Sequence, residues 1–241
     1  MKTVIITGTS SGIGLDLVKT FDSKGYRVIS LSRNDLPNTT NFSENVNHIN
    51  FDITNNSDVN SLVLLIKSKY SNVDVLINNA GKLISKPFGD FSDSEFRSIY
   101  DVNFFGVVDL IKSLLPYFHE KSHIVNISSV GGINGSSKFP GLSSYSSSKG
   151  ALNILTEVLA VEFKNGPYIN SLCLGAVQTP MLELAFPDYK ASTTPAEMAN
   201  FIYGFSTSNP IMFNGKIIPV SISNPWFQIS KNLFQLNQLT M

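Results

Sequence analysis

The chain has 241 residues, of which 42% are hydrophobic, and a formal net charge of zero. This length fits a single domain with a sizeable core, and the balanced charge argues against nucleic acid or an acidic membrane surface as a partner. The single cysteine, Cys173, allows no disulfide within the chain, and we expect it in the apolar core. We find no signal peptide and no apolar run of the roughly 18 residues that a membrane span needs, so we expect a cytoplasmic protein.

Strand and helix patterns alternate along the chain. Apolar, β-branched strand patterns occur near residues 3–7, 27–31, 46–50, 73–77, 122–127, 168–173 and 216–220. Helical patterns occur near residues 13–24, 57–70, 93–118 with a break around Asn103, and 144–164. This alternation predicts a single, doubly wound α/β domain over residues 1–223, with a parallel sheet of about seven strands and helices on both faces.

A glycine loop joins the first strand to the first helix. Gly8, Gly12 and Gly14 follow the strand, and the apolar positions of a helix come next. Glycines allow a tight turn and the close approach of a pyrophosphate, and the helix behind them presents free N–H groups and the positive end of its dipole. A glycine turn without a ligand is the alternative, but the order of strand, loop and helix favours a Rossmann-type dinucleotide site.

Tyr145 and Lys149 lie one helical turn apart in the predicted helix 144–164. Alone, this pair indicates only a helix face. Here it follows the glycine loop, an Asn-Asn-Ala-Gly segment at 78–81, Asn103 and the serine pair at 128–129. Together these residues indicate a centre for hydride transfer.

With these motifs the chain resembles the short-chain dehydrogenase/reductase family, in its compact branch, from Lys2 to about Ser221. The resemblance implies that Tyr145 donates a proton while a nicotinamide supplies the hydride. An unperturbed phenol has a pKa near ~10, and we expect the Lys149 ammonium to lower it. Ser129 would polarise the substrate carbonyl, and Asn103 would hold a water in a relay to the lysine. Singly, Ser129 could be a strand-end cap and Asn103 a helix breaker.

The end of the second predicted strand bears on the choice of cofactor. Ser32 stands where NAD-dependent members have an acidic residue, and Arg33 resembles the arginine that pairs with a 2′-phosphate, although it could be an ordinary surface arginine. We therefore expect NADP(H) to be preferred over NAD(H), with Asp52 and Ile53 against the adenine. No metal site is expected. The expected cofactor-binding residues are Gly8, Ser10, Ser11, Gly12, Ile13, Gly14, Arg33, Asp52, Ile53, Asn79, Ala80, Gly81, Tyr145, Lys149 and Thr179.

Several segments depart from the family pattern. The segment from Ser129 to Tyr145 is longer than usual, Leu174 replaces a proline, and the stretch between Thr179 and Pro195 is short. The tail at 224–241 is unusually apolar and predicts either a subunit contact or a lid over the substrate. The helix 144–164 is amphipathic in its second half, and the resemblance implies a homodimer or homotetramer that uses this helix.

These observations predict an NADPH-dependent carbonyl reductase of a small or medium organic ketone or aldehyde. An alcohol dehydrogenase that uses NAD(P)+ is the alternative among enzymes, because the residues do not determine direction. A catalytically idle dinucleotide-binding regulator or scaffold is the alternative outside enzymes. The complete set of Asn103, Ser129, Tyr145 and Lys149 argues against the idle protein.

Overall fold

The computed structural model describes residues 1–222. The predicted tail, including Trp226 and Phe227, therefore lies outside the described residues. Within 1–222, no helix is both long and apolar enough to cross a bilayer.

In residues 1–222, seven strands form one parallel sheet, which confirms the predicted fold class. They are β1 (Thr3–Thr7), β2 (Arg27–Ser32), β3 (Val46–Asn50), β4 (Val73–Asn78), β5 (Phe118–Ser129), β6 (Tyr168–Leu174) and β7 (Ile217–Val220). Their order in the sheet is β3-β2-β1-β4-β5-β6-β7, and every neighbouring pair is parallel. The direction of strand addition reverses between β1 and β4, and the crevice outside the carboxyl ends at such a point is the usual ligand site of this architecture.

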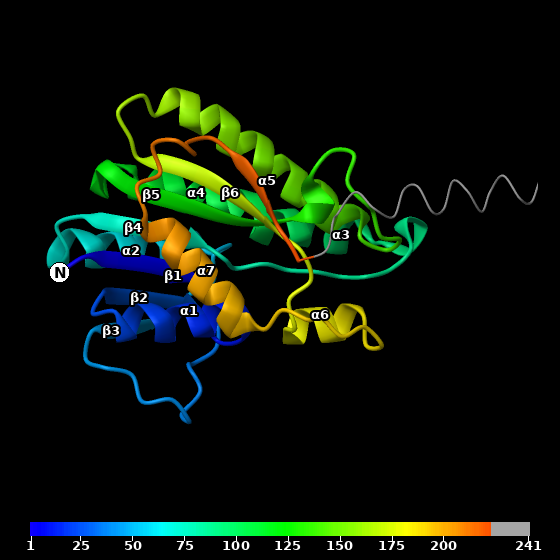
Figure 1. The fold of residues 1–241 in the computed structure, drawn as a ribbon, viewed down its shortest axis with the longest axis horizontal. Coiled ribbons are helices and arrows are strands. Elements are labelled where there is room, and N and C mark those ends of the chain that lie inside the picture. Colours follow the sequence, from blue (N-terminus) through cyan, green and yellow to red (C-terminus); the bar gives the residue numbers. More distant parts are fainter. Residues whose placement is uncertain (223–241) are drawn as a thin grey trace, which may run out of the picture.

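The helices cover both faces of this sheet (Figure 1). They are α1 (Gly12–Ser23), α2 (Asn56–Lys69), α3 (Asp93–Tyr100), α4 (Gly106–Leu114), α5 (Ser143–Glu162), α6 (Pro180–Ala185) and α7 (Pro195–Thr207). Short 3-10 turns lie at Phe88–Asp90, Leu115–Tyr117 and Val130–Gly132, and a π-helical turn spans Asp101–Phe105.

Side chains of successive residues on β1 point to opposite faces and enter two separate cores. Ile5 joins the core under α2, α4 and α5, whereas Val4 and Ile6 join the core under α1 and α7. The helices α1, α2, α4, α5 and α7 contribute apolar side chains to these cores, as Leu110 and Leu114 do from α4. Both faces of the strands are therefore buried, as expected for a parallel sheet between two helical layers.

Three element predictions need correction. The helices α6 and α7 were not predicted, and β5 begins at Phe118, where we expected the end of a helix. The expected break at Asn103 is a π-helical turn that continues directly into α4. The start of α7 has a readable signal, because Thr194 and Glu197 form a reciprocal capping box with Pro195 in the first turn.

Candidate active site

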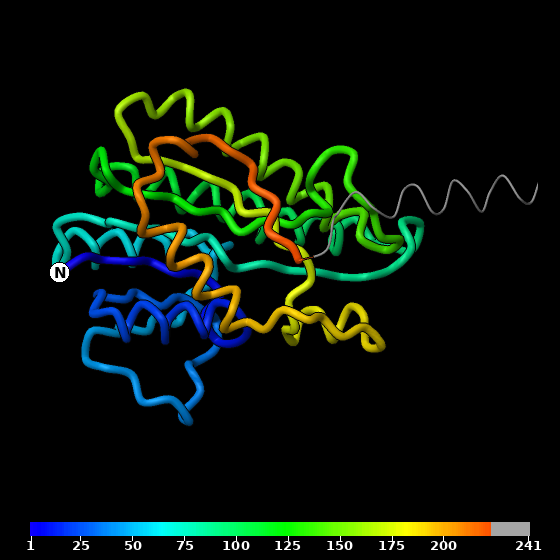
Figure 2. The backbone as a smooth tube through the Cα atoms, viewed as in Figure 1, coloured from blue at the N-terminus to red at the C-terminus, as the bar shows by residue number. Residues whose placement is uncertain are grey.

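The carboxyl ends of the strands open into a cleft of about 980 Å³. In Figure 2 the connections that border it, with α6 in yellow, lie at the end of the sheet opposite the N-terminus. Every residue that we expected to bind cofactor lines this cleft, and so do the expected catalytic residues except Asn103. The structure therefore brings together residues from the carboxyl ends of six strands, β1 to β6.

The glycine loop is held tightly against the residues that follow β4. The Asn79 side-chain amide donates to the carbonyls of Thr7 (2.9 Å) and Gly8 (3.0 Å). In return, the Thr7 hydroxyl oxygen accepts from the backbone N–H groups of Asn79 and Ala80. Asn79 thus positions the loop through its side chain, and Thr7 is a positioning residue that the sequence reasoning missed.

Two glycines leave no room for a side chain. A Cβ atom on Gly14 would lie 2.0 Å from the Gly8 carbonyl oxygen, and one on Gly8 would lie 2.7 Å from the Ala80 Cα. Gly8 and Gly12 also have positive φ angles of 72° and 56°, which residues with a side chain rarely adopt. The loop needs glycine both for its backbone conformation and for its packing.

The start of α1 fits a bound pyrophosphate. Ser11 is the N-cap residue, yet its side chain makes no capping hydrogen bond, and the first turn of α1 contains no acidic residue. The first N–H groups of a helix are unsatisfied within the helix and favour an anion. A Cβ atom on Gly12 would lie 3.3 Å from the Thr179 methyl group, so glycine at this position keeps open the space between α1 and the β6 side. These features fit a dinucleotide lying across the sheet.

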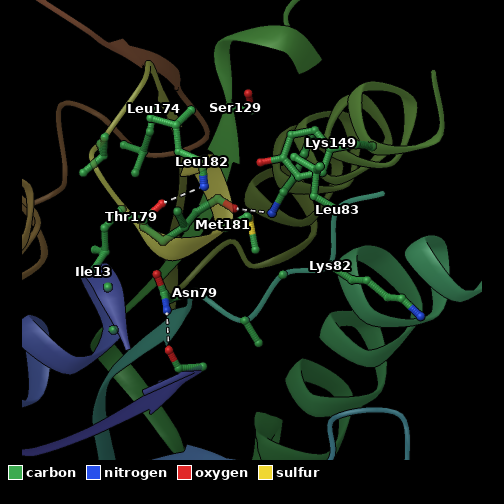
Figure 3. A pocket seen from close by; sticks show the side chains of 18 of the residues that line it. Ile13, Asn79, Lys82, Leu83, Ser129, Lys149, Leu174, Thr179, Met181 and Leu182 are labelled. Atoms are coloured by element: carbon green, nitrogen blue, oxygen red, sulfur yellow. Dashed lines mark hydrogen bonds between the residues drawn. The ribbon is translucent and has the colours of Figure 1, made fainter. Parts of the chain in front are cut away.

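Lys149 is buried beneath the cleft, with 4% of its surface exposed. Its Nζ donates to the Ile127 carbonyl oxygen at 2.7 Å, as Figure 3 shows. Burial lowers the pKa of Lys149 to about 8. The lysine is therefore held in place by the β5 backbone and titrates close to neutral pH.

Tyr145 is half-buried, and its ring centroid lies 5.8 Å from Lys149 Nζ. We expected the lysine to lower the pKa of Tyr145, but the structure shows the opposite direction. Burial raises the pKa to about 12, and a hydrogen bond with Ser129 opposes this rise only in part. Burial also disfavours the charged ammonium of Lys149. Its charge therefore does not offset the hydration that the Tyr145 phenolate would lose. Tyr145 is therefore a protonated phenol at neutral pH.

Ser129 lies at the carboxyl end of β5. Its hydroxyl oxygen accepts from the Gly131 N–H at 3.1 Å and caps the turn that follows. Because the same hydroxyl lowers the pKa of Tyr145 through a hydrogen bond, the two side chains converge on one point of the cleft. Ser129 thus fulfils the strand-end capping role and also faces Tyr145.

Asn103 is fully buried and connects three segments. Its Oδ1 accepts from the Lys82 N–H at 2.8 Å, and its Nδ2 donates to the Lys82 carbonyl and to the Ser148 hydroxyl, each at 3.0 Å. Ser148 in turn donates to the Tyr145 carbonyl at 2.8 Å. Asn103 therefore links the π-helical turn to the helix that carries the tyrosine, and Ser148 is a partner that the sequence reasoning missed.

Arg33 and Asp52 lie at the other end of the cleft, after β2 and β3. Burial raises the pKa of Asp52, but two hydrogen bonds from Thr54 and the charges of Arg33 and Lys82 outweigh this and lower it. The Ser32 hydroxyl donates to the Asn34 carbonyl at 2.7 Å. The cleft-lining residues at the end of β2 and just after it, Leu31 to Asn34, include a guanidinium and no carboxylate.

Known proteins match this chain in sequence and in structure. Residues 2–190 match the short chain dehydrogenase family. An uncharacterized oxidoreductase of Staphylococcus aureus (strain MW2) is 29% identical over 210 residues, which cover 83% of this chain and 89% of that protein.

Two solved structures illustrate the structural match. A 4-hydroxyisoleucine dehydrogenase complexed with NADH superposes with a TM-score of 0.82 at 26% identity, covering 94% of this chain and 99% of the other. ElxO with NADP bound superposes with a TM-score of 0.81 at 27% identity, covering 91% of this chain and 97% of the other. The protein thus belongs to the short chain dehydrogenase family, and it is an NAD(P)-dependent oxidoreductase.

Proposed function

We propose that the protein is an NADPH-dependent reductase of small or medium organic ketones and aldehydes, with Tyr145 as the proton donor. The observation that carries this proposal is the convergence of Tyr145, Ser129 and Lys149 on one point of the dinucleotide cleft. When bound, the nicotinamide supplies the hydride. The chain supplies the proton and the groups that orient the carbonyl.

The protonation state of Tyr145 fits the role of proton donor in a reduction. Reduction needs the phenol with its proton, and burial keeps that proton by raising the pKa to about 12. Ser129 would donate to the carbonyl oxygen and polarise it, and Tyr145 would pass its proton to the same oxygen as charge develops there. Lys149, held by the Ile127 carbonyl, would stabilise the phenolate that remains. Asn103 would keep α5 in register with the segment after β4.

The preference for NADPH rests on the adenosine end of the cleft. Arg33 can donate two charge-assisted hydrogen bonds to a 2′-phosphate. The neighbouring cleft-lining residues, Ser32 and Asn34, are neutral, so they would not repel this phosphate. Asp52 and Ile53 would contact the adenine.

Assembly through α5 is part of the same proposal. Ile154, Val158 and Val161 lie on one stripe of α5 and are 62%, 48% and 74% exposed. Apolar side chains repeated at this helical spacing favour packing against a second copy, as a homodimer or homotetramer. Val158→Asp should give a lighter particle by light scattering, and Leu64→Asp, on the exposed side of α2, should not.

The function is tested by following NADPH consumption with a panel of ketones and aldehydes. Turnover of any member above the rate without protein supports a reductase. Tight NADPH binding without turnover across the panel would instead favour the idle dinucleotide-binding protein. Turnover only of alcohols with NADP+ would favour the alcohol dehydrogenase.

A further inference from the structure

The end of the cleft next to Tyr145 has walls from two segments that are distant in sequence. One wall is the stretch between β5 and α5, which contributes Val130, Phe139 and Leu142. The other is the segment after β6, which contributes Met181, Leu182 and Phe186. The Phe139 and Phe186 rings meet at 6.0 Å between centroids and 62° between planes, so the two walls touch.

The second wall is fixed at its base. Val177 pairs with Thr193 in an isolated bridge, and the Gln178 side chain accepts from the Ala191 N–H at 2.8 Å. The loop between these residues therefore carries α6 back over the cleft. A Cβ atom on Gly81 would lie 3.7 Å from the Met181 methyl and 3.9 Å from Lys149 Nζ, so both side chains border the space beside Gly81 (Figure 3).

The charged side chains that line the cleft in the described part of the chain are Arg33, Asp52, Lys82 and Lys149. Arg33 and Asp52 follow β2 and β3, and β2 lies three strand spacings, about 14 Å, from β5. Lys82 points away from Lys149 in Figure 3 and contributes its charge to Asp52. Within residues 1–222, Lys149 is therefore the one charged side chain that lines the cleft from either wall or from α5. Its ammonium donates to the Ile127 carbonyl.

Two charged residues near the walls, Lys138 and Glu183, are held by contacts outside the cleft. Lys138, next to Phe139, donates its ammonium protons to the Ile133 carbonyl (2.7 Å) and to the carbonyl and hydroxyl oxygens of Ser136 (2.9 and 2.6 Å). Glu183, on α6, accepts from the Gln178 amide at 2.8 Å and is absent from the cleft lining. The polar side chains that do line the two walls and the start of α5, Ser137, Ser146 and Tyr189, are neutral.

We infer that the substrate is an uncharged carbonyl compound whose group beyond the carbonyl is apolar, and that Phe139 and Phe186 determine this specificity. This inference rests on the proposed reductase function. A carboxylate placed between the two walls would lose its hydration without gaining a cationic partner, and an unpaired buried charge is strongly disfavoured. An aromatic or aliphatic group would instead gain contacts with the two rings and with Met181.

A size-matched pair of aldehydes tests the inference. Methyl 4-formylbenzoate and 4-formylbenzoate carry the same reacting aldehyde. At the opposite end of the ring the first has a neutral methyl ester and the second a carboxylate. We expect kcat/KM with the wild-type protein and NADPH to be more than about tenfold higher for the ester than for the anion. A ratio below tenfold, or no turnover of the ester by a protein that reduces other carbonyls of the panel, would overturn the substrate class. No turnover across the whole panel would overturn the proposed function together with it.

A charge introduced on the wall makes the test specific. Phe186→Lys should raise kcat/KM for the anion relative to the ester by about tenfold, the scale of one charged hydrogen bond. Leu184→Lys is the matched control on α6, because Leu184 is 82% exposed and does not line the cleft. Phe139→Lys gives the same test from the opposite wall if the first variant does not fold. An unchanged ratio in both wall variants would show that these rings do not face the substrate.

Discussion

The two ends of the cleft are built in different ways. The dinucleotide end consists of backbone, with glycines that admit no Cβ atom and N–H groups at the start of α1. The substrate end consists of side chains on two connections, where Phe139 and Phe186 meet. A backbone site restricts the sequence to a few residue types, whereas a side-chain wall accepts many residues of similar volume. We therefore expect the first end to tolerate fewer sequence changes than the second.

The largest expected effect lies where the two ends meet. Tyr145→Phe keeps the ring between the walls but removes the proton donor. Turnover should fall by at least ~10²-fold, as expected for loss of a general acid, while NADPH binding measured by titration calorimetry is retained. Tyr100→Phe, on α3 outside the cleft, is the control and should turn over like the wild type. Near-normal turnover of Tyr145→Phe would exclude the tyrosine as the acid.

Arg33 tests whether the dinucleotide end also selects between cofactors. Arg33→Ala should weaken NADPH binding by about 1.5–3 kcal/mol, the scale of charged hydrogen bonds, and leave NADH binding nearly unchanged. Arg97→Ala, on α3, removes an arginine that does not line the cleft and serves as the control. Equal losses for both cofactors would assign Arg33 a structural role.

The glycine loop tests the contrast between backbone and side-chain construction. Gly14→Ala places a methyl group 2.0 Å from the Gly8 carbonyl oxygen, where the Asn79 amide prevents the loop from moving aside. We expect a loss of about 1–3 kcal/mol in the free energy of unfolding by urea, as for overpacking.

Two further variants complete that comparison. Gly204→Ala, in α7, has no atom within 4 Å of the new methyl group and should stabilise the protein by about 0.5–1 kcal/mol. Phe139→Ala, at a ring that is 45% exposed, should change stability by less than Gly14→Ala does. Similar losses at Gly14 and Phe139 would contradict the contrast between the two ends.

The sequence predicted the parallel sheet because buried strands carry an apolar, β-branched signal that depends on few neighbours. It also predicted which residues line the dinucleotide end, because tight backbone turns demand glycine. It did not predict α6, which has only six residues, nor the contact between Phe139 and Phe186. Such a contact depends on how two loops fold back over the cleft, and no periodicity in the sequence encodes it.

The direction of the Tyr145 pKa was wrong for a related reason. The spacing of Tyr145 and Lys149 indicates that the two groups are near each other, but it does not report how much water each has lost. In the structure burial is the largest influence on both groups, so the pKa of Tyr145 rises and that of Lys149 falls. Desolvation is a property of the folded environment, and a motif alone does not contain it.

The burial of Lys149 also predicts a pH dependence of stability. Lys149 has a pKa of about 8 in the folded protein, against 10.5 for an ordinary lysine. Between these values the unfolded chain binds more protons than the folded protein, so this lysine makes the free energy of unfolding rise with pH. Below pH 8 the folded protein carries the full cost of the buried ammonium, and the cost disappears as the pH approaches 10.5.

Lys149→Met removes this dependence. The free energy of unfolding should be measured by urea titration for both proteins at several values between pH 8 and 9, where an ordinary tyrosine, with a pKa of 10.0, stays largely protonated. The difference, wild type minus variant, should rise steadily with pH, because contributions from groups with the same pKa in both proteins cancel. The variant should also bind NADPH more weakly, since Lys149 is expected to reach the nicotinamide ribose. A difference that stays level with pH would mean that Lys149 keeps its proton when buried, and the Ile127 carbonyl would then be accepting from a fully charged ammonium throughout this range.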